Sequence, residues 1–290
     1  LINGIKKGRN GLGSIYVWAS GNGGHHSDDC NCDGYANSIY TLSISSASDQ
    51  GDVPWYSETC ASTFASTLSS GTHLQRRIIT TDLHNKCTNN HTGTSASAPI
   101  AAGVFALLLE SNRNLTWRDV QHLTVYTSNS ISLIKAGNWS KNSVGLNFHS
   151  KFGYGILDTN KLIEWATEKD WETSPPMFSC YIQSQDESNL LSSRGEISIN
   201  FFVDECEDGT NTVNFIEHAQ IQINIDHSHR GDLSIEVFSP SGTNSLLLHP
   251  RDEDDSTAGF SNWTMTSVHF WGEDPRGLWR VKFKDNGGIF

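Results

Sequence analysis

The fold of this chain is decided by the stretch Gly93-Thr-Ser-Ala-Ser-Ala-Pro99, which continues directly into the apolar residues Ile100 to Leu109. The whole apolar run has about 12 residues, which suits a buried helix and falls short of the roughly 20 that span a bilayer. The N-terminus of such a helix offers unpaired backbone N–H groups and a partial positive charge, where an oxyanion is stabilised. We therefore predict that Ser95, set between small residues at this position, is a nucleophile for carbonyl carbon, and that the chain holds no membrane segment.

A partner for this serine is expected at Asn22. The stretch Ser20-Gly-Asn-Gly-Gly24 follows the apolar strand predicted over Ile15 to Ala19. An Asn amide flanked by glycines can approach a tetrahedral intermediate and donate one hydrogen bond, while the backbone N–H of Ser95 donates another. Taken alone, the same stretch is more typical of a plain turn.

The pattern of secondary structure changes near residue 172. Before it, β-type segments at 14–19 and 39–45 alternate with helices predicted at Ser95, at 117–126 and at 159–169. Thr116 and Asp119 resemble a capping box at the start of the helix over 117–126. After the break Thr173-Ser-Pro-Pro176, apolar residues alternate with polar ones over 219–225 and 233–237. We expect an α/β domain over 1–172 and a β-sandwich or jelly-roll domain over 173–290.

The charge balance argues against nucleic acid as a partner. The net charge is −12, and residues 173–290 hold 18 acidic against 7 basic side chains, so nearly all of the excess lies there. No basic stripe is compatible with that balance. A polyanionic ligand is therefore not expected.

Cysteines and glycosylation sequons indicate an oxidising compartment. The six cysteines allow 15 complete pairings, which the sequence alone cannot separate. Disulfides are favoured over a zinc site at Cys30 and Cys32, because Cys-x-Cys is not the usual ligand spacing and no second pair follows. Four sequons fit a secreted glycoprotein; their asparagines are Asn90, Asn114, Asn138 and Asn262.

An acidic cluster lies close to Asn22 in the sequence and comprises Asp28, Asp29 and Asp33, with Glu58 farther along. Clustered carboxylates either bind Ca²⁺ through hard oxygen ligands or present negative charge to a cationic side chain. A solvated loop is the alternative use of the same residues. Spacing alone does not decide between these readings.

Ten motifs along the whole chain resemble those of the kexin/furin-like proprotein convertases, a branch of the subtilisin-like serine proteases. In the first part they are Trp18–Gly24, Cys30–Tyr35, Tyr40–Ile44, His91–Pro99, Asn114–Asp119 and Gln121–Leu123. In the second part the motifs Glu217–Ala219, Arg230–Leu233, Ser239–Thr243 and Trp271–Asp274 are similar to the P domain of that family. The resemblance implies a subtilisin-like α/β fold, a parallel sheet with helices on both faces whose N-terminal part precedes Leu1, followed by a P domain truncated at its C-terminal end.

The resemblance also implies roles for single residues. Ser95 corresponds to the nucleophile and Asn22 to the oxyanion donor. Asp28 and Glu58 correspond to calcium ligands beside the S1 pocket, and Asp33 to the residue that recognises the arginine at P1. The pocket would further be lined by the backbone of Ala19 and by Tyr35.

Two disulfides are implied in the same way, Cys30 with Cys60 and Cys180 with Cys206. Cys87 would pair with a cysteine that precedes this chain, and Cys32 would be free. In subtilisin-like chains the triad order is Asp, His, Ser. Residues 1–21 contain neither Asp nor His, so the general base and its carboxylate are expected before Leu1. Other histidines, such as His91, are not expected to replace the base.

The implied activity is that of a calcium-dependent serine endoprotease, which cleaves secretory precursors after paired basic residues through an acyl-enzyme. It would act in the secretory pathway, in the Golgi or secretory vesicles, with its own propeptide as an inhibitor. The isolated chain is expected to be inactive, since a serine without its base is a weak nucleophile. The alternative is a catalytically inactive homologue or truncated product that binds or chaperones other proteins.

Arg230-Gly-Asp232 is expected to be a turn rather than an integrin-binding site.

Overall fold

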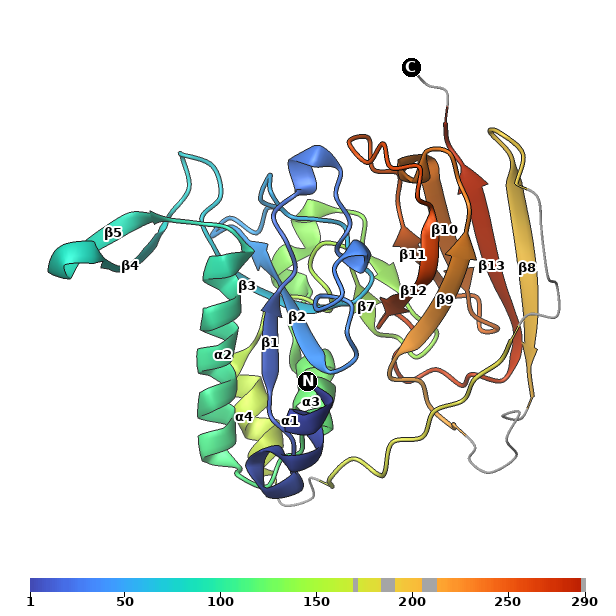
Figure 1. Ribbon diagram of the computed structural model, residues 1–290. Coiled ribbons are helices and arrows are strands. Elements are labelled where there is room, and N and C mark those ends of the chain that lie inside the picture. The colour runs from blue at the N-terminus through green and yellow to red at the C-terminus, as the bar shows by residue number, and fades with distance from the viewer. Residues whose placement is uncertain (169–171, 184–190, 205–212, 288–290) are drawn as a thin grey trace.

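The computed structural model describes residues 1–168, 172–183, 191–204 and 213–287. Two parts lie side by side and are joined by an extended segment (Figure 1). We call residues 1–168 the α/β part and residues 191–287 the β part.

A parallel sheet forms the centre of the α/β part. Its strands are β1 (Tyr16–Ala19), β2 (Thr41–Ala47) and β3 (Thr63–Leu68), in the order β1-β2-β3. Both neighbours pair with β2 in parallel. Every residue of β2 is buried, as expected for a parallel strand that is covered on both faces.

Helix α2 (Thr94–Ser111) packs against all three strands. Helix α4 (Thr159–Thr167) packs against α2, and α3 (Trp117–Thr127) contacts α4 and β3. Within the described residues, α2 is the one helix long and apolar enough to cross a membrane. Its contacts with the sheet, through buried residues such as Phe105 and Leu108, instead make it the core helix of this part.

The remaining elements of the α/β part are short. They are α1 (Ile2–Lys7), β4 (Ile78–Asp82), β5 (Lys86–His91), β6 (Ser140–Lys141), β7 (Asn147–Phe148) and the 3₁₀ turns η1 (Gly8–Gly11), η2 (Gly24–His26), η3 (Cys30–Cys32), η4 (Leu83–Asn85) and η5 (Ile131–Ala136). Strands β4 and β5 form an antiparallel hairpin that projects away from the body of the molecule (Figure 1). The hairpin leads directly into the N-terminus of α2.

The β part is an antiparallel sandwich of two sheets. Its strands are β8 (Glu196–Val203), β9 (Ala219–Ile225), β10 (Leu233–Phe238), β11 (Asn244–Leu248), β12 (Phe260–Ser267) and β13 (Gly277–Asp285). One sheet has the order β11-β10-β13-β8, and the other pairs β12 with β9. The alternating residues Leu233, Ile235 and Val237 are buried in the core that the two sheets share. The period-two pattern therefore marks the inward face.

The two parts share a hydrophobic contact. Trp271 comes from the β part, yet it is 0% exposed within the core of the α/β part. The backbone N–H of Val268 donates to the carbonyl of Ala61 at 3.0 Å, and the hydroxyl of Tyr154 donates to the carbonyl of Val268. The segment between β12 and β13 thus belongs to both cores.

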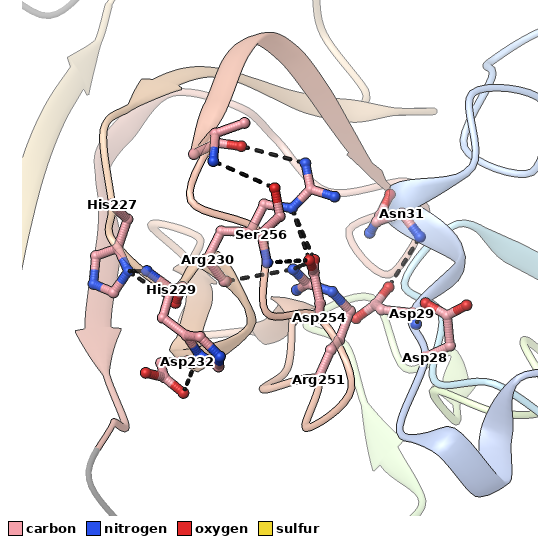
Figure 2. A network of polar contacts seen from close by, with 12 residues as sticks. Asp28, Asp29, Asn31, His227, His229, Arg230, Asp232, Arg251, Asp254 and Ser256 are labelled. Carbon is pink, nitrogen blue, oxygen red and sulfur yellow. Dashed lines mark hydrogen bonds and ion pairs between the residues drawn. The ribbon is translucent and has the colours of Figure 1, made fainter.

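The Arg-Gly-Asp sequence forms the 3₁₀ turn η6 (Arg230–Asp232) at the start of β10. The Arg230 guanidinium is paired with Asp254 at 2.8 Å, and Asp232 is paired with His229 at 3.0 Å. Gly231 is buried, and an added Cβ would lie 2.3 Å from the carbonyl oxygen of Asp254. Both charged side chains are engaged within the β part, as Figure 2 shows, so this sequence is a structural turn.

Candidate active site

Ser95 is the exposed hydroxyl at the N-terminus of α2. Its neighbours Thr94 and Ser97 are both 0% exposed. The Ser97 hydroxyl contacts Ser46 Oγ at 2.8 Å, and Thr94 Oγ1 bonds to the loop around Asn22. Of the three hydroxyls in this turn, Ser95 alone faces outward, and its N–H is among the donors that a helix leaves without an intrahelical partner.

The Asn22 amide is held by the same helix terminus. Its Oδ1 accepts from the backbone N–H of Thr94 at 2.8 Å and from Thr94 Oγ1 at 3.0 Å. The backbone N–H of Gly21 donates to Thr94 Oγ1 at 3.2 Å. Because the carbonyl oxygen of the amide is fixed by two donors, Nδ2 is the end that can donate to another group. Such an orientation suits an oxyanion donor.

Two glycines make this close approach possible. Gly93 has φ +87°, and an added Cβ would lie 3.0 Å from Asn22 Oδ1. Gly21 has φ +126°, and a Cβ there would lie 2.2 Å from Glu58 Oε1. Residues other than glycine rarely adopt these backbone conformations. A side chain at Gly93 would also displace the Asn22 amide, and one at Gly21 would displace the Glu58 carboxylate.

Of the residues expected to recognise a basic side chain, Asp33 and Tyr35 are exposed and Ala19 is half-buried. Asp33 Oδ1 accepts from the backbone N–H of Tyr35 at 2.7 Å and of Ala36 at 2.8 Å. One oxygen is thereby anchored, which leaves the other able to accept from a guanidinium. Tyr35 stacks on Trp18 with ring centroids 4.5 Å apart, next to Ala19 at the end of β1.

The expected calcium ligands Asp28 and Glu58 both lie against the glycines that flank Asn22. Glu58 Oε1 accepts from the backbone N–H of Gly23 at 2.8 Å, and a Cβ on Gly23 would lie 2.9 Å from Asp28 Oδ2. Burial raises the pKa of Glu58 to about 7; the Gly23 hydrogen bond opposes this rise, and the nearby Asp28, Asp29 and Asp33 add to it. A bound cation would relieve this repulsion, so the donor chemistry fits Ca²⁺. Among the described residues, no three His, Cys, Asp or Glu side chains are grouped so that they could hold a metal ion together.

Cys30 and Cys60 form a disulfide with Cα atoms 5.2 Å apart, which ties η3 to the segment before β3. Among the described residues Cys32 and Cys87 are free, the latter exposed on the hairpin. Cys180 is disulfide-bonded, and its expected partner Cys206 lies outside the described residues. All four sequon asparagines are exposed, namely Asn90, Asn114, Asn138 and Asn262.

Within the described ranges no histidine hydrogen-bonds to Ser95. His91 lies at the end of β5, where it pairs with Ile78 across the hairpin. The backbone carbonyl of His91 accepts from Ser70 Oγ at 2.7 Å. The described residues thus bring an exposed serine hydroxyl and an oriented asparagine amide to one helix terminus.

Two further residues, which were not predicted from the sequence, support the site. The first is Thr94, which holds the Asn22 amide at the helix terminus. Its position next to Ser95 within the Gly93–Pro99 motif could have indicated this role. The second is His249 of the β part, which contacts Asp29 at 2.7 Å. Asp29 belongs to the segment 28–33, which we call the acidic loop. Nothing near His249 in the sequence indicates that contact, because it joins positions 220 residues apart.

Comparison with known families assigns both parts. Residues 1–155 match the Subtilase family, and residues 216–289 match the Proprotein convertase P-domain. The crystal structure of a serine protease of Aeromonas sobria has the same fold, with a TM-score of 0.81 over 95% of this chain and 59% of that chain, at 21% sequence identity. The parallel sheet with its helices and the antiparallel sandwich are therefore the expected fold.

Similar sequences include furin of Homo sapiens, 49% identical over 98% of this chain, and Furin-like protease 1, isoform 1-CRR, of Drosophila melanogaster, 47% identical over 99% of this chain. The chain spans 35% and 25% of the lengths of these relatives. The chain belongs to the subtilase family, and its β part carries the proprotein convertase P-domain.

Proposed function

We propose that this chain is part of a calcium-dependent serine endoprotease that cleaves secretory precursor proteins after paired basic residues. One observation carries the proposal. The exposed Ser95 stands at the N-terminus of α2, and the amide of Asn22, 72 residues from Thr94, is oriented against that terminus by two hydrogen bonds. The border between the two proposed domains lies near residue 172.

In the proposed reaction, Ser95 Oγ attacks the scissile carbonyl while a histidine from the preceding part of the protein takes up its proton, and an aspartate from the same part orients that histidine. Asn22 Nδ2 and the backbone N–H of Ser95 donate to the developing oxyanion. The histidine then gives its proton to the leaving amine, the scissile C–N bond breaks, and water hydrolyses the acyl-enzyme that remains. Without those preceding residues this chain alone is expected to be nearly inert.

Specificity would come from the acidic loop. The free oxygen of Asp33 would accept from the arginine at P1, beside Tyr35 and the backbone of Ala19. Asp28 and Glu58 would hold Ca²⁺, together with oxygen ligands from outside the described residues. The bound ion would neutralise the carboxylates near S1 and fix the loop in place.

The proposed setting is the lumen of the secretory pathway. The disulfide Cys30–Cys60 and the four exposed sequon asparagines are consistent with that compartment. The partners would be precursor proteins with basic cleavage sites and the enzyme's own propeptide as inhibitor. Similarity to furin and to a furin-like protease supports this assignment.

The test is cleavage of an Arg-x-Lys-Arg fluorogenic peptide by the full-length protein in Ca²⁺. We expect cleavage that is lost in Ser95→Ala and on chelation of Ca²⁺. Ser111→Ala, at the other end of the same helix, is the matched control and should cleave like the wild type. Unchanged cleavage by Ser95→Ala would refute the role of Ser95. A folded wild type that cleaves nothing would instead favour the inactive binding or chaperone protein.

A further inference from the structure

The β part reaches the acidic loop of the α/β part directly. Figure 2 shows Asp29 facing the segment that holds Arg251 and Asp254, with Asp28 next to it on the side away from that segment. The side chain of Asn31 donates to the carbonyl of Leu247 at 2.8 Å across this contact. The loop proposed to hold Ca²⁺ and to recognise P1 is therefore packed against the P-domain.

Asp29 is the buried carboxylate of this contact, with its side chain 1% exposed. Oδ1 accepts from the backbone N–H of Asn31 at 2.9 Å, which caps η3. Oδ2 accepts from the backbone N–H of His249 at 3.1 Å and from His249 Nδ1 at 2.7 Å. Two of the three recorded donors to this carboxylate thus come from one residue of the β part.

The segment around His249 is itself braced. Arg251 has a side chain 3% exposed, and its Nη2 donates to Asp254 Oδ2 at 2.7 Å. Asp254 also accepts from Arg230 Nε at 2.8 Å. Although burial alone would raise the pKa of Asp254, hydrogen bonds from Arg251 and Arg230 lower it, so this carboxylate stays ionised. These ion pairs therefore hold the segment that carries His249 in place.

Asp29 lies between the two functions proposed for the loop. It directly follows Asp28, whose Oδ1 accepts the Asp29 backbone N–H at 2.8 Å. It caps the turn η3, which ends at Cys32, next to Asp33. A buried carboxylate that loses a donor is destabilised, so the loop would have to move to hydrate it. Any such movement displaces Asp28 and Asp33 together.

We propose that His249 is a positioning residue, which holds Asp29 and through it sets the position of Asp33 for a basic substrate side chain. The proposal rests on the protease function proposed above. It assigns to the P-domain a specific contact with the acidic loop. His249 touches neither the substrate nor Ser95, so its loss should weaken substrate binding more than turnover.

The kinetic test uses the full-length protein and the Arg-x-Lys-Arg peptide. We expect His249→Ala to raise KM about fivefold to tenfold with kcat changed by less than about twofold. His249→Asn should restore KM, because its Nδ2 takes the place of Nδ1. Asp29→Asn removes the charge from the other side of the contact and should raise KM like His249→Ala. The control His229→Ala, at a P-domain histidine directed away from the loop (Figure 2), should leave KM unchanged.

Amide hydrogen exchange in the same proteins gives a readout that does not depend on activity. Residues 29–37 should exchange faster in His249→Ala and at the wild-type rate in His249→Asn, while β10 stays protected in both. Unchanged KM and unchanged exchange in His249→Ala and Asp29→Asn would overturn the proposal. If the wild type does not cleave the peptide, the protease function fails, and exchange at residues 29–37 alone decides whether His249 positions the loop.

Discussion

At the residue scale, hydrogen bonding separates Ser95 from two otherwise similar hydroxyls. Thr94 and Ser97 are buried and bonded to other groups, whereas Ser95 is exposed at the helix terminus. The same bonding orients Asn22, because Thr94 takes the carbonyl end of its amide. Helix polarity favours negative charge at this place.

This orientation predicts the effect of removing the amide. In the full-length protein, Asn22→Ala should lower kcat by about 100- to 1000-fold with little change in KM, as for an oxyanion donor of subtilisin, because the donor acts mainly on the transition state. Steady-state kinetics on the basic peptide measure this. A kcat within twofold of wild type would show that Asn22 is only a turn residue.

At the element scale, helix α3 depends on its first turn. Thr116 accepts from the backbone N–H of Asp119 at 3.1 Å, and Asp119 Oδ2 accepts from that of Thr116 at 2.7 Å, which completes a capping box. The helix carries Arg118 and His122, which both bond to Glu217 of the β part. The cap therefore also supports the contact between the parts.

We expect Thr116→Ala to lower the free energy of unfolding by about 1 kcal/mol, and Thr116→Ser to keep most of it. Thr116 is also the third residue of the Asn114 sequon, so both variants are compared in an Asn114→Gln background. Urea unfolding of the full-length protein measures the difference. Equal stability of the Ala and Ser variants would contradict a capping role.

At the scale of the whole molecule, the two parts are joined by buried polar groups as well as by Trp271. Burial alone would raise the pKa of Glu217, but hydrogen bonds from His122 and Arg118 lower it to about 2. His269 is 2% exposed and stacks on Phe148 with ring centroids 4.2 Å apart. The junction holds one carboxylate in its charged form and packs a neutral imidazole.

His269 predicts how the junction responds to acid. Burial, followed by the nearby His149, lowers the pKa of His269 from 6.5 to about 3. Its contribution to stability is therefore present above pH 6.5 and is lost as the pH falls toward 3. Between pH 7 and pH 5 this loss is about 2 kcal/mol.

A variant that cannot titrate should lack this part of the pH dependence. His269→Asn is expected to lose about 2 kcal/mol less than wild type between pH 7 and pH 5, measured by denaturant unfolding. The exposed His84→Asn, on the hairpin, serves as the control and should match the wild type. Equal pH dependence of wild type and His269→Asn would mean that His269 is not buried as a neutral imidazole.

Much of the fold could be predicted from local patterns. The helix at Ser95, the capped helix α3 and the alternation in β9 and β10 were expected close to their observed bounds. Strand β3 and the hairpin β4–β5 were not expected, because polar and small residues dominate them and give no clear periodicity. Tertiary pairing with β2 makes β3 a strand.

The candidate site was less accessible from sequence. Ser95 and Asn22 stood out because their local motifs restrict backbone and side-chain chemistry. The anchoring of Asn22 by Thr94 and of Asp29 by His249 depends on contacts between distant positions, which no local pattern records. The placement of Trp271 in the core of the other part is of the same kind.

Covalent labelling tests the central claim most directly. The full-length protein is treated with a fluorophosphonate in Ca²⁺, and the labelled peptide is identified by mass spectrometry. We predict one adduct, on Ser95, whose formation parallels the loss of peptide cleavage and which is absent in Ser95→Ala. Loss of cleavage with the adduct on another residue, and with Ser95 unmodified, would contradict the account.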